Sequence, residues 1–213
     1  MRRIWTLAAL LVLGLAASAR ATEIPIDQLS LPVPRDKEVR IDFPVGELQV
    51  EASTNSHVTL DLTAKCKRWG RDNCEESAER IAIESEEAGG ILRIKVKNYP
   101  KMHSGGFSLH GVLRLPRELA LRVEMGVGEL RVTDIEGDLD VDLGVGEADI
   151  RTPGRAVRSV EVATGVGDAS VVAGGGRVRR RSFISSSARW DEGRGRSTVS
   201  LNVGVGDATV RVD

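Results

Sequence analysis

The chain has 213 residues, with 30 basic and 31 acidic side chains and a net charge of −1 at pH 7. This balance argues against a nucleic-acid-binding protein, because such proteins usually carry a basic surface. Only 3% of the residues are aromatic. The core is therefore expected to consist of Val, Leu, Ile and Ala, which suits thin β-layers better than a thick globular core.

Residues 1–21 have the features of a secretory signal peptide. Arg2 and Arg3 form a basic start, residues 4–17 are uncharged and rich in Leu and Ala, and Ala-Arg-Ala at 19–21 matches a cleavage site. The apolar run has about 14 residues, fewer than the ~20 that a membrane-spanning helix needs. We therefore predict a cleaved signal and an exported chain, periplasmic or extracellular, that keeps no membrane span.

The segment after the signal divides into an extended lead-in and an irregular β-cap. The lead-in, residues 22–36, contains three prolines, and the cap spans residues 37–106. Strands are expected at 38–43, 47–52, 57–65, 80–85 and 91–97, with a short helical turn around 75–79. The last two strands flank a segment that ends in Gly-Gly, which predicts a β-hairpin.

Cys66 and Cys74 are the only two cysteines. In an exported protein, an isolated pair favours a disulfide that closes a small loop. A structural metal site would need about four ligands, and a thioredoxin-like redox motif would need the spacing Cys-x-x-Cys. The sequence offers neither near this pair, so we predict a structural disulfide.

Residues 107–213 contain an internal repeat whose centre is Gly-Val-Gly followed by an acidic residue. Its glycines are Gly126 and Gly128, Gly144 and Gly146, Gly165 and Gly167, and Gly204 and Gly206. A related copy lies at 41–50, and a degenerate copy at 181–190 fills the one long gap. The resulting intervals of 18, 21, 19 and 20 residues indicate a regular structural unit of about 20 residues.

Each unit is predicted to be a strand, a corner and a second strand. Apolar and acidic residues alternate in 139–143 and again in 147–150, but the two alternations are out of phase across the glycines. The chain must bend there to keep both apolar sets inside. We therefore predict an all-β chain, a β-solenoid with rungs of about 20 residues. A β-sandwich of hairpins is the alternative, since turns also recur every 8–12 residues.

The corners at 126–129, 144–147, 165–168 and 204–207 resemble those of the bacterial family named "putative adhesin". The resemblance covers residues 36 to 213, and its motifs are less specific before residue 107. It implies a secreted or envelope-associated β-solenoid with no assigned catalytic residues. Related modules in envelope-stress systems are sometimes attached to membrane segments.

Four acidic side chains are candidates for a metal site. Glu129, Glu147, Asp168 and Asp207 recur at one corner position, where a carboxylate ladder could bind Ca²⁺ or simply accept hydrogen bonds from turn backbone. The corners lack the pattern of calcium-binding nonapeptide repeats. We predict no metal and no cofactor.

Catalytic arrangements are not evident in the sequence. Asp140, Asp142 and Asp149 are expected to point outward, as paired carboxylates do in polysaccharide-cutting enzymes, but outward alternation alone explains them. His57, His103 and His110 lack metal-ligand spacing, and the serines at 185–187 lack the elbow of a nucleophilic serine. The Gly-Val-Gly motif opens no helix, which excludes a phosphate-binding loop. A catalytic role is therefore not expected.

The degenerate copy is rich in arginine. Two interpretations are open: a docking patch that uses Arg geometry and a Trp anchor, or a solvated face on which Trp190 takes an inward position. The residues of the possible patch are Arg177, Arg179, Arg180, Arg181 and Arg189, next to Trp190.

The sequence favours a non-catalytic, adhesin-like scaffold of the cell envelope that binds an envelope protein or a surface polysaccharide. A periplasmic adaptor that senses envelope stress and recruits another protein is the alternative. A polysaccharide-acting enzyme is a more distant one.

Overall fold

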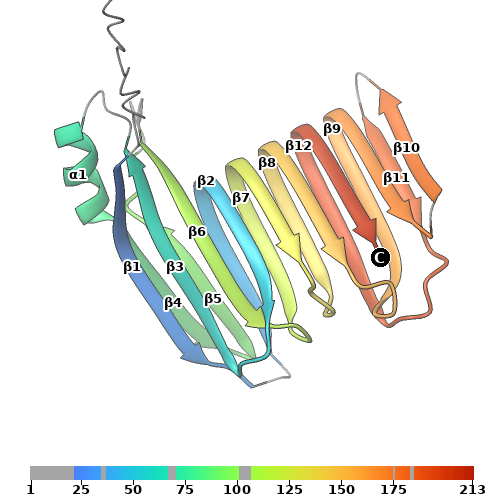
Figure 1. Ribbon diagram of the computed structural model, residues 1–213, viewed down its shortest axis with the longest axis horizontal. Helices are drawn as coiled ribbons and strands as arrows, with labels where there is room; N and C mark the ends of the chain where they lie inside the picture. Colours follow the sequence, from blue (N-terminus) through green and yellow to red (C-terminus); the bar gives the residue numbers. More distant parts are fainter. Residues whose placement is uncertain (1–21, 35–36, 67–70, 101–106, 175, 183–184) are drawn as a thin grey trace, which may run out of the picture.

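The structure is a computed structural model that describes residues 22–34, 37–66, 71–100, 107–174, 176–182 and 185–213. These residues form strands in nearly every segment and one short helix (Figure 1). The strands are β1 (Thr22–Pro32), β2 (Glu38–Ser53), β3 (His57–Cys66), β4 (Ala82–Ala88), β5 (Ile91–Lys97), β6 (Phe107–Pro116), β7 (Ala120–Thr133), β8 (Leu139–Thr152), β9 (Val157–Ala173), β10 (Gly176–Ser182), β11 (Ser186–Trp190) and β12 (Ser197–Val212), and the helix is α1 (Arg71–Arg80).

All twelve strands belong to one large sheet that does not close on itself. Its centre consists of five long strands that run parallel in the order β2, β7, β8, β12, β9. Figure 1 shows that each of them bends in the middle, so that one strand contributes an arm to each of two facing layers. The bends line up along one edge of the stack.

The order of the strands in space differs from their order in the chain. A simple solenoid stacks its rungs in chain order, whereas here the last strand, β12, lies between β8 and β9 and pairs in parallel with both. The degenerate copy at 181–190 is not a parallel rung, which corrects the expected alignment. Instead β10 and β11 both pair antiparallel with β9 and cover its outer edge.

Both ends of the stack are completed by separate strands on each arm. The first arm of β2 pairs with β5, which pairs with β4, while the second arm pairs with β6, which is followed by β3 and β1. At the far end, β11 extends the first arm of β9 and β10 extends the second. Residues 22–32 of the predicted lead-in form a strand, β1. The strands expected as separate pieces at 38–43 and 47–52 are one bent strand, β2.

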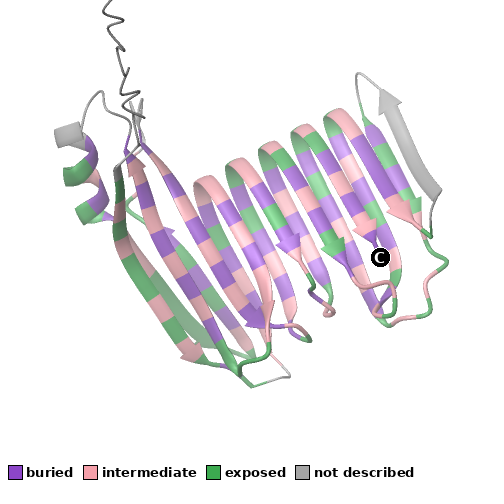
Figure 2. Ribbon diagram, viewed as in Figure 1, coloured by how far each residue is buried: buried purple, intermediate pink, exposed green. Residues whose placement is uncertain are grey.

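The core lies between the two arms, and alternate residues of each arm point into it (Figure 2). The size of the buried side chains near the corner decreases from β2 toward β9. In spatial order, the last inward residues before the corner are Phe43, Met125, Leu143, Val203 and Thr164. Because protein interiors are packed at constant density, the space between the layers must narrow in the same direction.

Several buried hydroxyl groups donate hydrogen bonds to backbone carbonyls. The Thr152 hydroxyl donates to the Ile135 carbonyl at 2.8 Å, and the Ser197 hydroxyl donates to Ala156 at 2.7 Å. At the narrow end, Thr164 and Ser186 both donate to the Gly167 carbonyl, at 3.0 and 2.9 Å. These bonds offset the cost of burying a hydroxyl.

Within the described part of the chain, no helix has both the length and the apolar character needed to cross a membrane.

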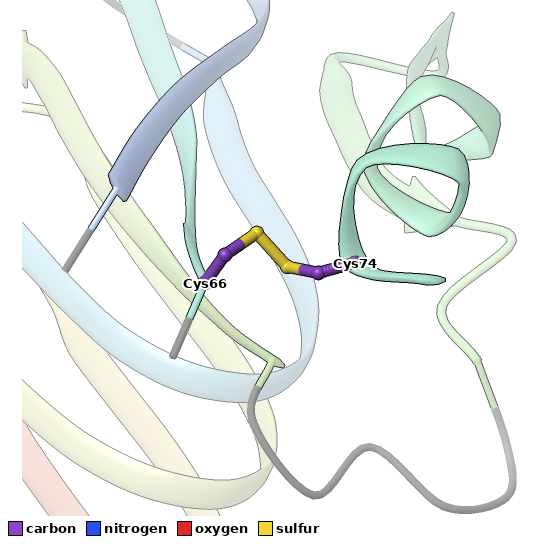
Figure 3. Close-up of a disulfide and its surroundings, with 2 residues drawn as sticks. All are labelled: Cys66 and Cys74. Carbon is purple, nitrogen blue, oxygen red and sulfur yellow. A yellow bond between two sulfur atoms is a disulfide. The ribbon is translucent and has the colours of Figure 1, made fainter. Parts of the chain in front are cut away.

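Cys66 and Cys74 form the predicted disulfide (Figure 3). It joins the end of β3 to α1, and both cysteines are buried. Over residues 74–81, whose side-chain burial is described, the buried residues besides Cys74 are Ala78 in the helix and Ile81 just after it. The disulfide therefore holds a helix that has little packing of its own.

Reduction of this disulfide is expected to release α1 without unfolding the stack. A bridge between residues eight positions apart stabilises by about 2–3 kcal/mol through the entropy of the unfolded chain, more than the few buried side chains of α1 can replace. Native-state hydrogen exchange of the Cys66→Ala/Cys74→Ala variant should show α1 amides exchanging freely while β8 and β12 stay protected. Loss of protection in β8 and β12 would instead place α1 in the cooperative core.

Candidate functional site

The repeated corners lie side by side in register. Gly46, Gly128 and Gly146 are directly paired across β2, β7 and β8, and Gly206 of β12 pairs with Gly146. Val166 of β9 continues the row opposite Val205. The second glycine of each corner has a positive φ between 132° and 145°, a region that residues with a Cβ rarely adopt.

The first glycine of each corner is needed for a different reason. A Cβ at Gly144 would lie 2.5 Å from the carbonyl oxygen of Gly126, and a Cβ at Gly126 would lie 2.3 Å from that of Pro44. In each corner the obstructing carbonyl belongs to the neighbouring strand on the β2 side of the stack. In β2 this position is Pro44, which begins the row of corners and therefore meets no carbonyl of a preceding corner. This explains why β2 does not need a glycine there.

The valine between the two glycines is exposed in each corner. The side chains of Val127, Val145, Val166 and Val205 are 45–48% exposed, although valine usually lies inside. Strand spacing places them about 4.8 Å apart along the edge of the stack. We call this row of four residues the valine ridge. Figure 2 shows exposed residues recurring at the bends.

A shallow trough of about 530 Å³ runs beside the valine ridge across β2, β7, β8 and β12. Its lining includes the first glycines of three corners and outward polar residues of the first arm. Those polar residues are Asp42, Glu124, Asp142 and Asn202. The trough therefore presents the same kinds of group at each strand, a geometry that suits an extended and periodic ligand.

Arg122 organises the charges of the first arm. Its guanidinium donates to Glu124 at 3.1 Å, to Asp140 at 2.8 Å and to Asp142 at 3.2 Å. The hydrogen bond to Glu124 and the negative charges of Asp140, Asp142 and Glu124 raise the pKa of Arg122, against the opposing effect of burial. Asn202 adds a hydrogen bond to Asp142 at 3.3 Å.

The predicted carboxylate ladder lies on the second arm, just after the corner. Glu47, Glu129, Glu147 and Asp207 are in register, and Asp207 accepts a hydrogen bond from the Asp168 backbone amide at 3.0 Å. Glu129 pairs with Arg131. Over the described residues, no three His, Cys, Asp or Glu side chains are grouped closely enough to hold a metal ion.

The pKa of Glu47 is affected by burial and by its charged and polar neighbours. Burial acts to raise its pKa, but hydrogen bonds from Gln49 and Lys65 and the charges of Lys65 and His110 outweigh burial, and the pKa is lowered. The Lys65 ammonium and His110 Nδ1 each lie 3.2 Å from Glu47 Oε2. The contact with His110 is an ion pair only when the imidazole is protonated.

The structure separates Asp149 from the other two candidate catalytic aspartates. Asp140 and Asp142 lie on the first arm of β8 beside Arg122, whereas Asp149 lies on the second arm, where it pairs with Arg211. The two sets thus occupy opposite outer faces. His57 lies at the start of β3 and His110 in the middle of β6, and His103 is outside the described residues.

The arginine-rich segment forms the terminal strands β10 and β11. Arg177, Arg179, Arg180 and Arg181 lie in β10, where only the backbone pairing with β9 is described. Arg189 is 67% exposed and lies 3.2 Å from Glu161. Trp190 is partly buried against the core, in the same inward row as Ser186 and Ala188, so Trp190 and Arg189 face opposite sides.

Sequence reasoning singled out the corner glycines but missed the exposed valines and the trough. One signal was present, because the alternation of apolar and polar residues breaks at Gly-Val-Gly. A residue at the tip of a bend belongs to neither arm, and it can therefore be apolar and exposed.

The fold and corners define a class of all-β proteins in which long bent strands stack in parallel. The chain belongs to the family described as the N-terminal domain of toast_rack, DUF2154, which matches residues 22–172. No curated protein is similar enough to be matched.

Two solved structures are similar to this chain to different degrees. A structure described as a putative cell adhesion protein from Clostridium sporogenes has 15% identity and a TM-score of 0.51, covering 89% of this chain and 100% of that chain. A putative adhesin from Bacteroides fragilis has 12% identity and a TM-score of 0.28, covering 90% and 98%. The first likeness supports a common fold.

Proposed function

We propose that this chain is an exported, non-catalytic binding module of the bacterial cell envelope, similar in role to an adhesin. The observation that carries the proposal is the valine ridge, because it exposes four identical apolar side chains in register beside a polar trough. Exposed apolar groups gathered along one edge are typical of interaction sites. The corners thus form a periodic surface for an extended partner.

Several features support this proposal. The N-terminal segment has the pattern of a secretory signal, and the family resemblance is to envelope-associated β-solenoids. The parallel stack of bent strands agrees with a solenoid-like scaffold, even though β12 is inserted out of chain order. A scaffold of this kind presents ligand-binding groups on rigid strands, which limits the entropy lost on binding.

A co-sedimentation assay with isolated envelope fractions tests the function. The mature chain should sediment with cell wall, outer membrane or capsular polysaccharide from the source bacterium. Replacing all four ridge valines by threonine keeps the β-branched shape that strands favour but removes apolar surface. We expect the variant to bind at least about tenfold more weakly, since each desolvated anchor contributes roughly 1 kcal/mol or more.

The matched control replaces Val112 and Val172, which are partly exposed on the second arm away from the corners, by threonine. This variant should bind like the unchanged chain. Equal binding by the ridge variant would refute the role of the ridge, and sedimentation with no fraction would refute the adhesin-like function. Specific in-cell crosslinking from the ridge to one inner-membrane protein would favour the adaptor alternative.

A further inference from the structure

Three arginines lie directly beside one another on adjacent parallel strands. Arg40 of β2 is in register with Arg93 of β5 on one side and with Arg122 of β7 on the other. Like charges directly opposite each other across strands destabilise a sheet. We call Arg93, Arg40 and Arg122 the arginine row. The repulsion between its positive charges must be offset by negative groups.

The three arginines are compensated to very different degrees. Arg122 contacts three carboxylates, and Arg40 donates to both carboxylate oxygens of Glu38, from Nε at 2.7 Å and from Nη2 at 3.2 Å. Arg93 makes no ion pair or side-chain hydrogen bond with the described residues, although Glu86 lies opposite it in register. The row therefore contains one guanidinium with unused donors, next to a second that is bound on one side only.

A cavity of about 230 Å³ lies over the arginine row. Arg40, Arg93, Arg122 and Lys95 line it, together with Asp42 and Glu124. The Asp42 carboxylate lies 3.5 Å from Lys95, and Glu124 is bound by Arg122. Both carboxylates of the cavity are thus already paired, which leaves Arg93 and the free side of Arg40 to receive a ligand.

We propose that this cavity binds an oxyanion, a phosphate or carboxylate group carried by an envelope polymer. Guanidinium groups recognise both anions through two parallel hydrogen bonds. The side chains of Arg40 and Arg122 are 37% and 35% exposed, so they are held by neighbours yet open to solvent. A bound anion would also relieve the repulsion between Arg93 and Arg40.

The arginine row and the valine ridge have no residue in common, although Asp42 and Glu124 line both the cavity over the row and the trough beside the ridge. The arginine row lies on the first arm of β5, β2 and β7, and the ridge lies at the bends of β7, β8, β12 and β9. If the chain does not bind anions, the proposed adhesin-like function is not contradicted. Likewise, substitutions in the valine ridge do not alter the arginine row.

Isothermal titration of the mature chain with inorganic phosphate and, separately, with a galacturonic acid trimer tests the proposal. We expect one or both probes to bind, and binding to weaken as salt is raised. Binding of phosphate alone assigns the site to phosphate-bearing polymers, and binding of the trimer alone assigns it to uronic acids. The Arg40→Gln/Arg93→Gln variant should bind at least about tenfold more weakly.

Stability provides a second readout that separates ligand binding from a structural role. The double variant removes a like-charge contact but also the ion pair of Arg40 with Glu38, and because an exposed pair contributes little to stability, its urea midpoint should change little. The control variant Arg131→Gln/Arg189→Gln removes two exposed arginines elsewhere and should bind both probes normally. Binding of neither probe, or full binding by the double variant, overturns the proposal, as does a clear fall in its urea midpoint.

Discussion

Replacing Gly146 by alanine is expected to prevent β8 from taking its place in the stack. A Cβ at this position would lie 1.7 Å from the carbonyl oxygen of Gly128, and the backbone φ of Gly146 is +145°. Neither the neighbouring backbone nor the bend can move without breaking the parallel register on both sides. We expect a loss of more than about 4 kcal/mol, at the upper end of single-residue effects, measured by urea denaturation.

Three control variants separate the two causes of this loss. Gly144→Ala meets the Gly126 carbonyl at 2.5 Å without a positive φ, so its cost reports the steric contact alone. Gly90→Ala has φ +81° and no atom within 4 Å, so it reports the backbone strain, about 1–3 kcal/mol. Pro44→Ala should be nearly neutral, because β2 begins the row. A mild effect of Gly146→Ala would contradict the close packing of the corners.

The corners also show how far the sequence can predict this fold. Alternation of Leu139, Val141 and Leu143 with aspartates predicts their burial, and the buried arm of β8 confirms it. The insertion of β12 between β8 and β9 could not be predicted. All the corners carry nearly the same residues, so exchanging two rungs preserves both the alternation of inward and outward residues and the register.

The candidate sites were harder to predict from the sequence than the fold was. The valine ridge requires knowing that Val145 lies at the tip of a bend, whereas apolar character alone predicts burial. The arginine row depends on the register between β5 and β2, which joins residues about 50 positions apart. Alternation assigns Arg93 and Arg40 to outward faces but cannot place them side by side.

The second large effect is expected at the wide end of the core, where Phe43 lies fully buried. Phe43 is the largest residue of the inward row that narrows through Met125, Leu143 and Val203 to Thr164. Truncation to alanine leaves a cavity between the two arms, which the strands around the bend cannot close. We expect Phe43→Ala to lower the free energy of unfolding by about 3–5 kcal/mol, measured by urea denaturation.

Gly111 of β6 allows this prediction to be tested by a double-mutant cycle. A Cβ at Gly111 would lie 2.9 Å from the Phe43 ring and 3.2 Å from a Leu48 methyl group, so Gly111→Ala overpacks the core by about 1–3 kcal/mol. Phe43→Leu should remove part of that contact. The combination Phe43→Leu/Gly111→Ala is therefore expected to lose less stability than the sum of the single changes, by about 0.5–3 kcal/mol.

The sign of this coupling distinguishes two explanations for the glycine. If Gly111 is present to make room for the aromatic ring, the leucine variant must accept the added methyl group more readily than the unchanged chain does. If Gly111 is needed only for its backbone, the two changes will be additive within about 0.5 kcal/mol. Additivity would mean that the backbone of β6, and not the side chain of Phe43, determines the space available at the wide end of the core.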